Sequence, residues 1–538
     1  MIKYKAGRRG DDMIKTSIIA PVKYTNDLLA EIVARELEFP RDEITSVAIR
    51  KRTLDLSDKS SPVYKMTVAF AASPEREAGL LKMKKRVSID PVLTFEIKKR
   101  KLDYTPIVVG AGPAGLFAAL TLARGGANPI IVERGLPVEE RGKKVDFFNR
   151  TGILDPECNV QFGEGGAGTY SDGKLKCGSM DKYKLSVLED FVAAGADEDI
   201  LYSANAHLGT DKLPEIVKRI RENIISLGGR FMFSTKLTDI KLRDGKIVGA
   251  VVECDGRVTE LPTRAIIMAT GHSAEDGFRI LERLGVKMTA KGFGIGVRVE
   301  HRREYINELI YGRGYSAELP TASYHLVTHL DCGRSVYSFC MCPGGSVVAA
   351  ASSAGGVVTN GMSEYLRDGE NSNSALLVSV TPEDFSSDSP LAGIELQRRI
   401  ERAAFTSGGG DYKAPVWRNS DFMERKRTSL IGEVSPTYPR GTELVFPDDY
   451  LPEYITESLR LAMLDFDEWL PGFNHPDAIF TGAETRSTSP IRVERGENYQ
   501  SPSLEGLYPA GEGAGYAGGI VSSATDGVRA AEALLESK

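Results

Sequence analysis

The feature that most constrains this chain is a glycine-rich turn between a short apolar run and an alanine- and leucine-rich stretch. Residues 106–109 form the apolar run, and Gly110, Gly112 and Gly115 follow it at G-x-G-x-x-G spacing. Glycine allows a tight turn and a close approach of ligand to backbone, and a helix that starts there favours an anion at its N-terminus. The pattern predicts a strand, a turn and a helix that begin a dinucleotide-binding fold.

The residues after the turn complete this pattern. Residues 116–124 are rich in alanine and leucine, as a buried helix would be, and residues 129–132 form a second apolar run. The acid at the end of that run, Glu133, is placed to accept hydrogen bonds from an adenosine ribose. We therefore expect these residues to bind the cofactor: Gly110, Gly112, Pro113, Ala114, Gly115, Glu133 and Arg134.

The fingerprint alone does not separate FAD from NAD, but the segments that follow favour FAD. They predict an amphipathic helix, a short strand, a three-stranded meander and a returning apolar strand. The expected ranges are 213–227, 231–233, 236–242, 247–253, 257–261 and 264–271. This order resembles the FAD-binding fold of the glutathione-reductase-like flavoproteins, in which an Ala-Thr-Gly element closes the FAD domain. The resemblance implies that Thr270 and Gly271 lie at the cofactor.

The C-terminal segment carries a second part of the same resemblance. In that family a strand delivers a Gly-Asp pair to the ribityl chain, and the next helix points its N-terminus at the flavin. Here Gly511 and Glu512 stand at that place, and Gly518, Gly519 and Ile520 open a helix that runs to about residue 535. Glutamate is one methylene longer than aspartate and can make the same hydrogen bond. The alternative is a glycine-rich loop that ends an unrelated domain.

A glycine-rich loop over 161–175 supplies further candidates. Related flavoproteins run a loop past the diphosphate and the isoalloxazine at this place. The residues expected at the cofactor are Gly165, Gly166, Thr169, Ser171 and Lys174, because glycine permits close approach and the polar side chains can donate hydrogen bonds. The alternative is a flexible surface loop.

Residues 272–505 contain no second dinucleotide fingerprint. Gly292, Gly294 and Gly296 have a suggestive spacing, but residues 295–301 continue as an alternating strand. The chain is therefore expected to hold FAD alone, with NAD(P)H as a transient electron donor if it is used at all.

Beyond these motifs, the chain resembles a family of bacterial FAD-dependent dehydrogenases without an assigned substrate. The resemblance covers nearly the whole length and is carried by segments 163–175, 294–301, 337–345, 481–490 and 508–519. It implies an FAD-dependent oxidoreductase that transfers hydride to or from an unidentified small molecule. Because fold does not fix function, two alternatives stay open: an FAD-dependent monooxygenase or hydroxylase, and a flavoprotein with structural FAD and a binding role.

The expected fold class is α/β. A Rossmann-like, discontinuous FAD-binding domain is expected over 101–290 and 478–538, with a mixed-sheet cap over 291–477. Residues 1–100 are predicted to form a ferredoxin-like α+β domain, because strands and helices alternate there as β-α-β-β-α-β. The expected strands are 14–21, 44–52, 63–70 and 92–97, and the expected helices are 26–37 and 73–85.

Composition excludes several classes of function. The chain has 538 residues, enough for about three domains, and its net charge of −6 disfavours a nucleic-acid partner. No apolar window is long enough to span a membrane, and the N-terminus does not have the pattern of a signal peptide. Six cysteines in a chain of this length do not form a disulfide scaffold, so the expected location is the cytoplasm.

Catalytic residues are harder to identify. Cys340 and Cys342 are expected on one face of a strand over 336–342, where they either cycle as a redox pair or pack in the core.

Arg298, His301 and Arg486 are candidates for an anionic substrate, and the alternative for Arg298 is a surface ion-pair lattice. No metal site is expected, because the only suggestive histidines, His325 and His329, lie in a strand-like context.

Overall fold

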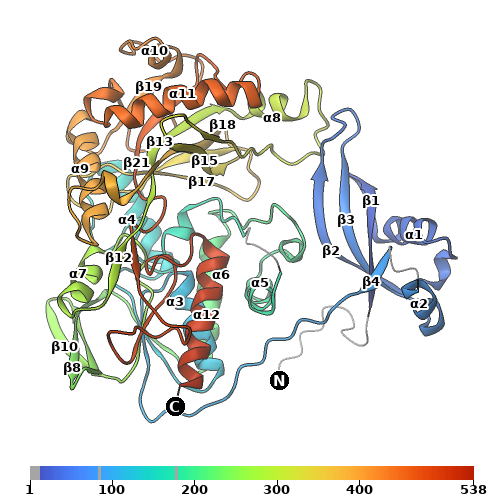
Figure 1. Ribbon diagram of the computed structural model, residues 1–538, viewed down its shortest axis with the longest axis horizontal. Coiled ribbons are helices and arrows are strands. Elements are labelled where there is room, and N and C mark those ends of the chain that lie inside the picture. The colour runs from blue at the N-terminus through green and yellow to red at the C-terminus, as the bar shows by residue number, and fades with distance from the viewer. Residues whose placement is uncertain (1–12, 83–85, 176–179, 538) are drawn as a thin grey trace.

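The computed structural model describes residues 13–82, 86–175 and 180–537 (Figure 1). Its N-terminal unit is a four-stranded antiparallel sheet with strand order β2-β3-β1-β4, covered on one face by two helices. The elements are β1 Ile14–Pro21, α1 Asn26–Glu36, β2 Ser46–Asp55, β3 Val63–Ala71, α2 Pro74–Leu81 and β4 Val87–Ile89. This is the predicted ferredoxin-like arrangement. Alternate residues such as Met66, Val68 and Phe70 pack against Leu29 and Val33 of α1.

The prediction of a last strand over 92–97 is wrong. The fourth strand is β4, and residues 90–100 run as an extended segment without a neighbouring strand. Phe95 and Ile97 alternate with polar residues because they pack on the core of the next unit, where Phe95 contacts Tyr183 of α5 (Lys182–Ala193). Alternation of apolar and polar residues with period two indicates that one side of an extended segment is buried. Here that side packs against a helical surface and not within a sheet.

The centre of the fold is a five-stranded parallel sheet with strand order β23-β11-β5-β6-β7. Its strands are β5 Ile107–Val109, β6 Ile130–Val132, β7 Arg230–Met232, β11 Ile266–Met268 and β23 Leu507–Pro509. The strands β5, β6, β11 and β23 are buried throughout and are short apolar runs, whereas the edge strand β7 begins with the exposed Arg230. Because β23 comes from the far end of the chain, the unit is discontinuous in sequence, as predicted.

Different layers cover the two faces of this sheet. Helices α3 Pro113–Arg124, α5, α6 Leu213–Ser226 and α12 Ile520–Glu536 pack on one face. The other face contacts the predicted three-stranded meander of β8 Thr235–Arg243, β9 Lys246–Cys254 and β10 Arg257–Pro262, together with α7 Glu275–Arg283. The three layers bring the C-terminal ends of the parallel strands to a common edge, where open α/β sheets bind ligands.

A seven-stranded mixed sheet lies above that edge, with order β14-β15-β18-β13-β21-β19-β20 (Figure 1). Its strands are β13 Phe293–Arg302, β14 Val327–His329, β15 Ser335–Cys342, β18 Asn371–Val380, β19 Ala414–Arg418, β20 Thr442–Leu444 and β21 Ile479–Glu484. Gly294 and Gly296 lie in β13, which confirms that they do not belong to a second nucleotide fingerprint.

Further elements surround this sheet and join it to the parallel sheet. The helices are α4 Val138–Thr151, α8 Arg303–Tyr311, α9 Ala392–Ser407, α10 Asn419–Met423 and α11 Glu453–Trp469. Two antiparallel pairs are formed by β12 Met288–Ala290 with β22 Ile491–Val493 and by β16 Gly345–Ala349 with β17 Thr359–Ser363. Short 3-10 turns occur at Arg41–Glu43, Ala167–Tyr170, Glu198–Leu201, Pro382–Asp384 and Pro447–Asp449.

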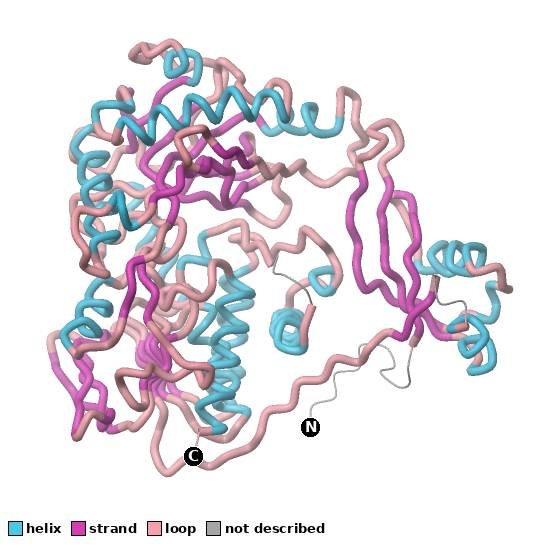
Figure 2. The backbone as a smooth tube through the Cα atoms, in the orientation of Figure 1, coloured by secondary structure: helices cyan, strands magenta, loops and turns pink. Residues whose placement is uncertain are grey.

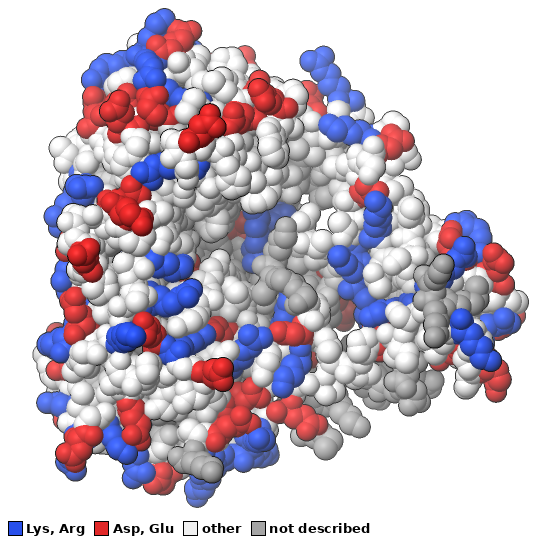
Figure 3. Space-filling model, in the orientation of Figure 1, with Lys and Arg blue, Asp and Glu red and all other residues white. Residues whose placement is uncertain are grey.

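The N-terminal unit stands beside the rest of the chain, with α1 and α2 on its outer side (Figure 2). One backbone contact ties its sheet to the body: the Arg52 N–H donates to the Tyr202 carbonyl, and the Ala204 N–H donates to the Arg52 carbonyl. Basic and acidic side chains are intermixed over the face in view (Figure 3). Among the described residues, none of the helices has the length and apolar character needed to cross a membrane.

Candidate functional site

A cavity of about 620 Å³ lies between the parallel sheet and the seven-stranded sheet. Its lower wall is built from the β5–α3 turn, the end of β6, the 161–174 loop and the turns that follow β11 and β23. Its upper wall comes from the seven-stranded sheet and from residues 323–325. The volume lies within the usual range of ligand sites, roughly 300–1,000 Å³.

Most of the predicted cofactor residues line this cavity. Those that do are Gly110, Gly112, Pro113, Ala114, Glu133, Arg134, Gly166, Ser171, Lys174, Thr270, Gly271, Glu512, Gly518, Gly519 and Ile520. Those that do not are Gly115, Gly165, Thr169 and Gly511. The second group packs one layer behind the wall, where a side chain at Gly115 would collide with the Gly110 carbonyl.

The fingerprint turn shapes one end of the cavity. Gly110 has a φ of 99°, in the left-handed region, and a Cβ there would collide with the Ala269 carbonyl. Gly112 is the N-cap of α3 and Pro113 is its first residue, which suits a helix start because proline lacks the N–H that would be unpaired there. The N-terminus of α3 therefore opens onto the cavity with its free N–H groups and its positive dipole end.

Glu133 is held by the protein backbone. Its Oε2 accepts the Ala111 N–H at 2.7 Å, and its Oε1 accepts the N–H groups of Gly135 and Gly163 at 2.9 and 3.0 Å. A carboxylate has about four acceptor sites, so about one acceptor site remains free on this cavity-lining side chain. The three amides fix the orientation of this carboxylate before any ligand binds.

The 161–174 loop is anchored by an arginine that the sequence analysis missed. Arg141 of α4 is fully buried, and its guanidinium donates hydrogen bonds to five backbone carbonyls, two just before the loop and three within it. Those carbonyls belong to Asn159, Val160, Gly163, Glu164 and Gly166. The loop is therefore not the flexible surface segment of the alternative interpretation. The spacing of charged residues along α4 does not distinguish the buried Arg141 from its exposed charged neighbours, so no sequence pattern marked it as an anchor.

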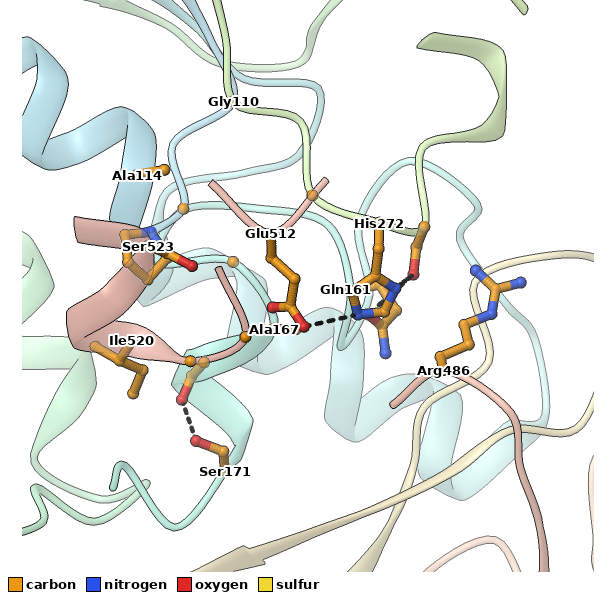
Figure 4. A pocket seen from close by; sticks show the side chains of 18 of the residues that line it. Gly110, Ala114, Gln161, Ala167, Ser171, His272, Arg486, Glu512, Ile520 and Ser523 are labelled. Carbon is orange, nitrogen blue, oxygen red and sulfur yellow. Dashed lines mark hydrogen bonds and ion pairs between the residues drawn. The ribbon is translucent and has the colours of Figure 1, made fainter. Parts of the chain in front are cut away.

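Glu512 and His272 face each other in the middle of the cavity (Figure 4). His272 Nε2 lies 4.0 Å from Glu512 Oε1. Burial raises the pKa of Glu512 to about 7, against the opposing effect of Lys291. Burial and the nearby Arg486 charge lower the pKa of His272 to about 4, so this imidazole is neutral at pH 7.

The Ser273 hydroxyl donates to Gln161 Oε1 at 3.1 Å beside this pair. His272 and Ser273 were not predicted as site residues. They directly follow Thr270 and Gly271, which were, so their position in the chain could have identified them.

Arginines of the upper wall are paired with carboxylates. Arg486 lines the cavity and forms a two-point ion pair with Glu401, at 2.8 and 2.9 Å. Arg367 also lines it and pairs with Asp172 in the same way, at 2.9 and 2.5 Å. Neither side chain is an unpaired cation.

Arg298 and His301 do not line the cavity, which corrects their prediction as substrate-binding residues. Arg298 is fully buried behind the wall, so the surface ion-pair lattice is also wrong. His301 points to the other side of β13, where its Nε2 is 2.8 Å from the Phe473 carbonyl. Every residue of β13 except Arg302 is buried, so alternation along this strand does not separate a site face from a core face.

The two cysteines of β15 are not equivalent. Cys340 lines the cavity, whereas Cys342 is fully buried. The expectation of regular alternation is wrong, because the pairing of β15 with β18 shifts register between Phe339 and Cys342, and Cys340 has a φ of 42°. The Cys342 thiol and the charges of Arg298 and Lys174 lower the pKa of Cys340. In the described part of the chain, no cluster of histidine, cysteine and acidic side chains has the makeup of a metal site.

Two family profiles match parts of this chain. The profile of the FAD-dependent protein, C-terminal domain-like family matches residues 292–487, and that of the FAD binding domain family matches residues 105–141. An uncharacterized protein from Clostridium beijerinckii is 43% identical over 515 residues, which are 95% of this chain and 96% of that protein. A thioredoxin reductase from Bacillus subtilis is 30% identical over 112 residues, 18% of this chain and 34% of that protein.

Solved structures resemble the chain only distantly. A triple mutant of the flavin-dependent brominase Bmp2 aligns over 80% of each chain, with a TM-score of 0.37 and 12% identity. A geranylgeranyl bacteriochlorophyll reductase-like protein from Thermoplasma acidophilum aligns over 80% of this chain and 78% of its own, with a TM-score of 0.34 and 12% identity. Likeness at this level carries no inference about activity.

Proposed function

This chain belongs to an uncharacterised family of bacterial FAD-dependent proteins, and from that premise we propose that it transfers hydride between FAD and a small molecule held under the seven-stranded sheet. FAD is its cofactor, and its family is one of oxidoreductases. The observation that carries the proposal is the continuity of the cavity. One space extends from the fingerprint turn at Gly112 to Cys340 and Arg486 in the upper wall.

The residues present fit FAD. The α3 N-terminus with Gly112 suits a diphosphate, since a Cβ at Gly112 would point into open space with only Gly166 Cα nearby, at 3.7 Å. The open acceptor site of Glu133 suits a ribose hydroxyl. Glu512 and the N-terminus of α12 suit the ribityl chain and the flavin ring. We propose that the predicted residues lining the cavity bind FAD, and that Gly115, Gly165, Thr169 and Gly511 support them from behind.

FAD supplies two-electron chemistry, and the chain binds, orients and shields it. The N-terminus of α12, at Gly519 and Ile520, would stabilise negative charge nearby through its dipole. The neutral imidazole of His272 adds no positive charge to the site, and the Glu512 carboxyl titrates near pH 7, so it can hold or release a proton there. These two side chains are our candidates for proton handling.

The polar and charged side chains of the upper wall limit the charge that a substrate can carry. Ser323, His325 and Asn360 are polar there, while Arg367 and Arg486 are already paired with carboxylates. A second strong anion would have to compete with those partners. We therefore propose a neutral or weakly charged polar substrate, in place of the anion expected from the arginines alone.

We further propose that the N-terminal unit over residues 1–100 is accessory to this chemistry, and that 101–290 with 478–538 bind FAD while 291–477 cover it. The contact of Arg52 with residues 202–204 supports this division, because the next two residues, Asn205 and Ala206, line the cavity. The N-terminal unit would thereby steady one wall without reaching the reacting atoms.

The test is a visible spectrum of the purified protein, followed by anaerobic addition of NADH or NADPH. Absorption bands at about 370 and 450 nm mark oxidised flavin. Bleaching by a nicotinamide supports an oxidoreductase that takes a transient donor. A flavin that neither nicotinamide nor any panel of small polar substrates bleaches would contradict hydride transfer and leave FAD in a structural role. Oxygen consumption coupled to substrate hydroxylation would favour the monooxygenase instead.

A further inference from the structure

The cavity wall contains a pair of cysteines whose surroundings differ sharply. Cys340 faces the cavity and is partly exposed, while Cys342 is fully buried behind it. The Cys342 thiol lies 3.1 Å from the Cys340 carbonyl, so the second sulfur is held beside the first residue. An accessible thiol with a buried neighbouring thiol is the arrangement of an attacking and a resolving cysteine.

The backbone between them departs from a regular strand. Residues two apart in a strand have Cα atoms separated by roughly 6.7 Å, near the upper limit for a disulfide. The register shift after Phe339 and the left-handed φ of Cys340 break that geometry. The bulge turns Cys340 toward the cavity and keeps Cys342 within reach behind it.

Two cations are held beside Cys340 through backbone carbonyls, and their charges help to lower the pKa of its thiol. Arg298 donates from Nη1 to the Cys340 carbonyl at 2.8 Å, and Lys174 donates to the carbonyl of the intervening Met341. Arg298 is itself fixed by Glu484. Arg298 Nη1 also lies 4.0 Å from Cys342 Sγ, so what separates the two thiols is access: Cys340 lines the cavity and Cys342 does not. Exchange chemistry needs an accessible thiolate, which makes Cys340 the attacking residue.

Cys340 and Glu512 lie on opposite walls of one cavity, close enough that charge on Cys340 raises the pKa of the Glu512 carboxyl. Glu512 belongs to the segment that we assign to the flavin. We therefore infer that Cys340 and Cys342 form a dithiol–disulfide couple that exchanges two electrons with the bound flavin. This inference rests on the proposed binding of FAD in this cavity.

In the reducing direction, electrons move from the flavin to the disulfide. The Sγ–Sγ bond breaks when two electrons from the reduced flavin enter it. One proton from solvent ends on Cys342 Sγ, giving a thiol, and Cys340 Sγ keeps the negative charge as a thiolate. In the opposite direction the two sulfurs form the bond, the proton leaves and the flavin receives both electrons. The couple thus gives the chain a store for a second electron pair.

The experiment is an anaerobic dithionite titration of the FAD-loaded protein after mild oxidation and removal of the oxidant. Wild type is expected to take up about four electrons per FAD, against about two in Cys340→Ser and in Cys342→Ser, because the disulfide is a two-electron couple. Cys332→Ser is the matched control, since Cys332 is an exposed cysteine in the same sheet region, and it should titrate like wild type.

Alkylation followed by mass spectrometry gives a readout that is independent of flavin reduction. The peptide that holds both cysteines should resist alkylation in the oxidised protein and accept two labels after reduction. Cys342→Ala, judged folded by retained FAD, serves where the serine variant does not fold. About two electrons in wild type together with free alkylation of both thiols after oxidation would overturn the inference. That result would leave the nicotinamide and substrate test of the proposed function untouched.

Discussion

Arg298 and Glu484 form a two-point ion pair across the neighbouring strands β13 and β21, shielded from solvent. Arg298 Nε lies 2.6 Å from Glu484 Oε2, and Nη2 lies 2.8 Å from Oε1. The side chains are 0% and 4% exposed. Both charges are desolvated, so each depends on the other for compensation. The pair also fixes the carbonyl of Cys340, which connects core packing to the cavity wall.

Breaking this pair should be costly. We expect Arg298→Met to lower the free energy of unfolding by about 3–5 kcal/mol, because it leaves the Glu484 charge buried and uncompensated. The double variant Arg298→Met with Glu484→Leu should recover part of that loss. Urea unfolding measures both. The control is Arg427→Ala, which removes an exposed pair with Asp449 and should cost less than about 1 kcal/mol. Equal losses in Arg298→Met and the control would refute this view of the pair.

Gly112→Ala should separate folding from cofactor binding. The new Cβ meets nothing closer than Gly166 Cα at 3.7 Å, so we expect only the cost of an alanine N-cap, at most about 1 kcal/mol of the stability of the FAD-free protein. The methyl group would occupy space that a diphosphate needs, so FAD affinity should fall at least about tenfold. Fluorescence titration of the FAD-free protein measures the affinity. Gly79→Ala, in a helix with no atom near the new Cβ, is the control and should bind FAD normally. Unchanged affinity in Gly112→Ala would argue against the assigned diphosphate site.

His301 should make the fold sensitive to acid. Burial lowers the pKa of His301 to about 4 from 6.5, so the folded chain holds it neutral while the unfolded chain protonates it first. Its contribution to stability is therefore complete above pH 6.5 and is lost as the pH falls toward 4. The loss amounts to about 3 kcal/mol for a shift of this size.

The variant His301→Phe is expected to be less stable at pH 7, because the Phe473 carbonyl loses its partner, yet to lose about 3 kcal/mol less between pH 7 and 4. His329→Phe, at an exposed position, is the matched control. Chemical unfolding at several pH values gives the slopes, and parallel curves for wild type and His301→Phe would contradict the prediction.

Arg52 should hold the N-terminal unit against the body. Its Nη1 donates to the Tyr24 hydroxyl at 2.7 Å, and its guanidinium lies over the rings of Tyr64 and Tyr202. We expect Arg52→Ala to speed hydrogen exchange in residues 202–206 roughly tenfold, a loss of about 1.4 kcal/mol of local stability. Arg50→Ala is the control, because Arg50 is exposed on the same strand and pairs with Asp90. Equal exchange in both variants would show that Arg52 does not carry this contact.

Local pattern was enough to predict the layers of this protein. The fingerprint at Gly110, the apolar runs of β5, β6 and β11 and the glycines before α12 each have a short-range physical cause. A tight turn needs glycine, a doubly buried strand needs continuous apolar residues, and a helix start favours particular residues. The extended segment over 92–97 shows the limit of such patterns, since alternation revealed that one side was buried but not which surface buried it.

The sequence by itself therefore determined the parallel sheet, the glycine-rich turns that line the cavity and the ferredoxin-like unit, all of which depend on neighbours along the chain. Only the tertiary structure decided that Arg298 and His301 belong to the core, that Arg141 anchors the 161–174 loop, and that Cys340 turns into the cavity while Cys342 does not. These outcomes depend on residues dozens to hundreds of positions away, such as Glu484 opposite Arg298. Burial and charge pairing are set by contacts between distant segments, and no local spacing encodes them.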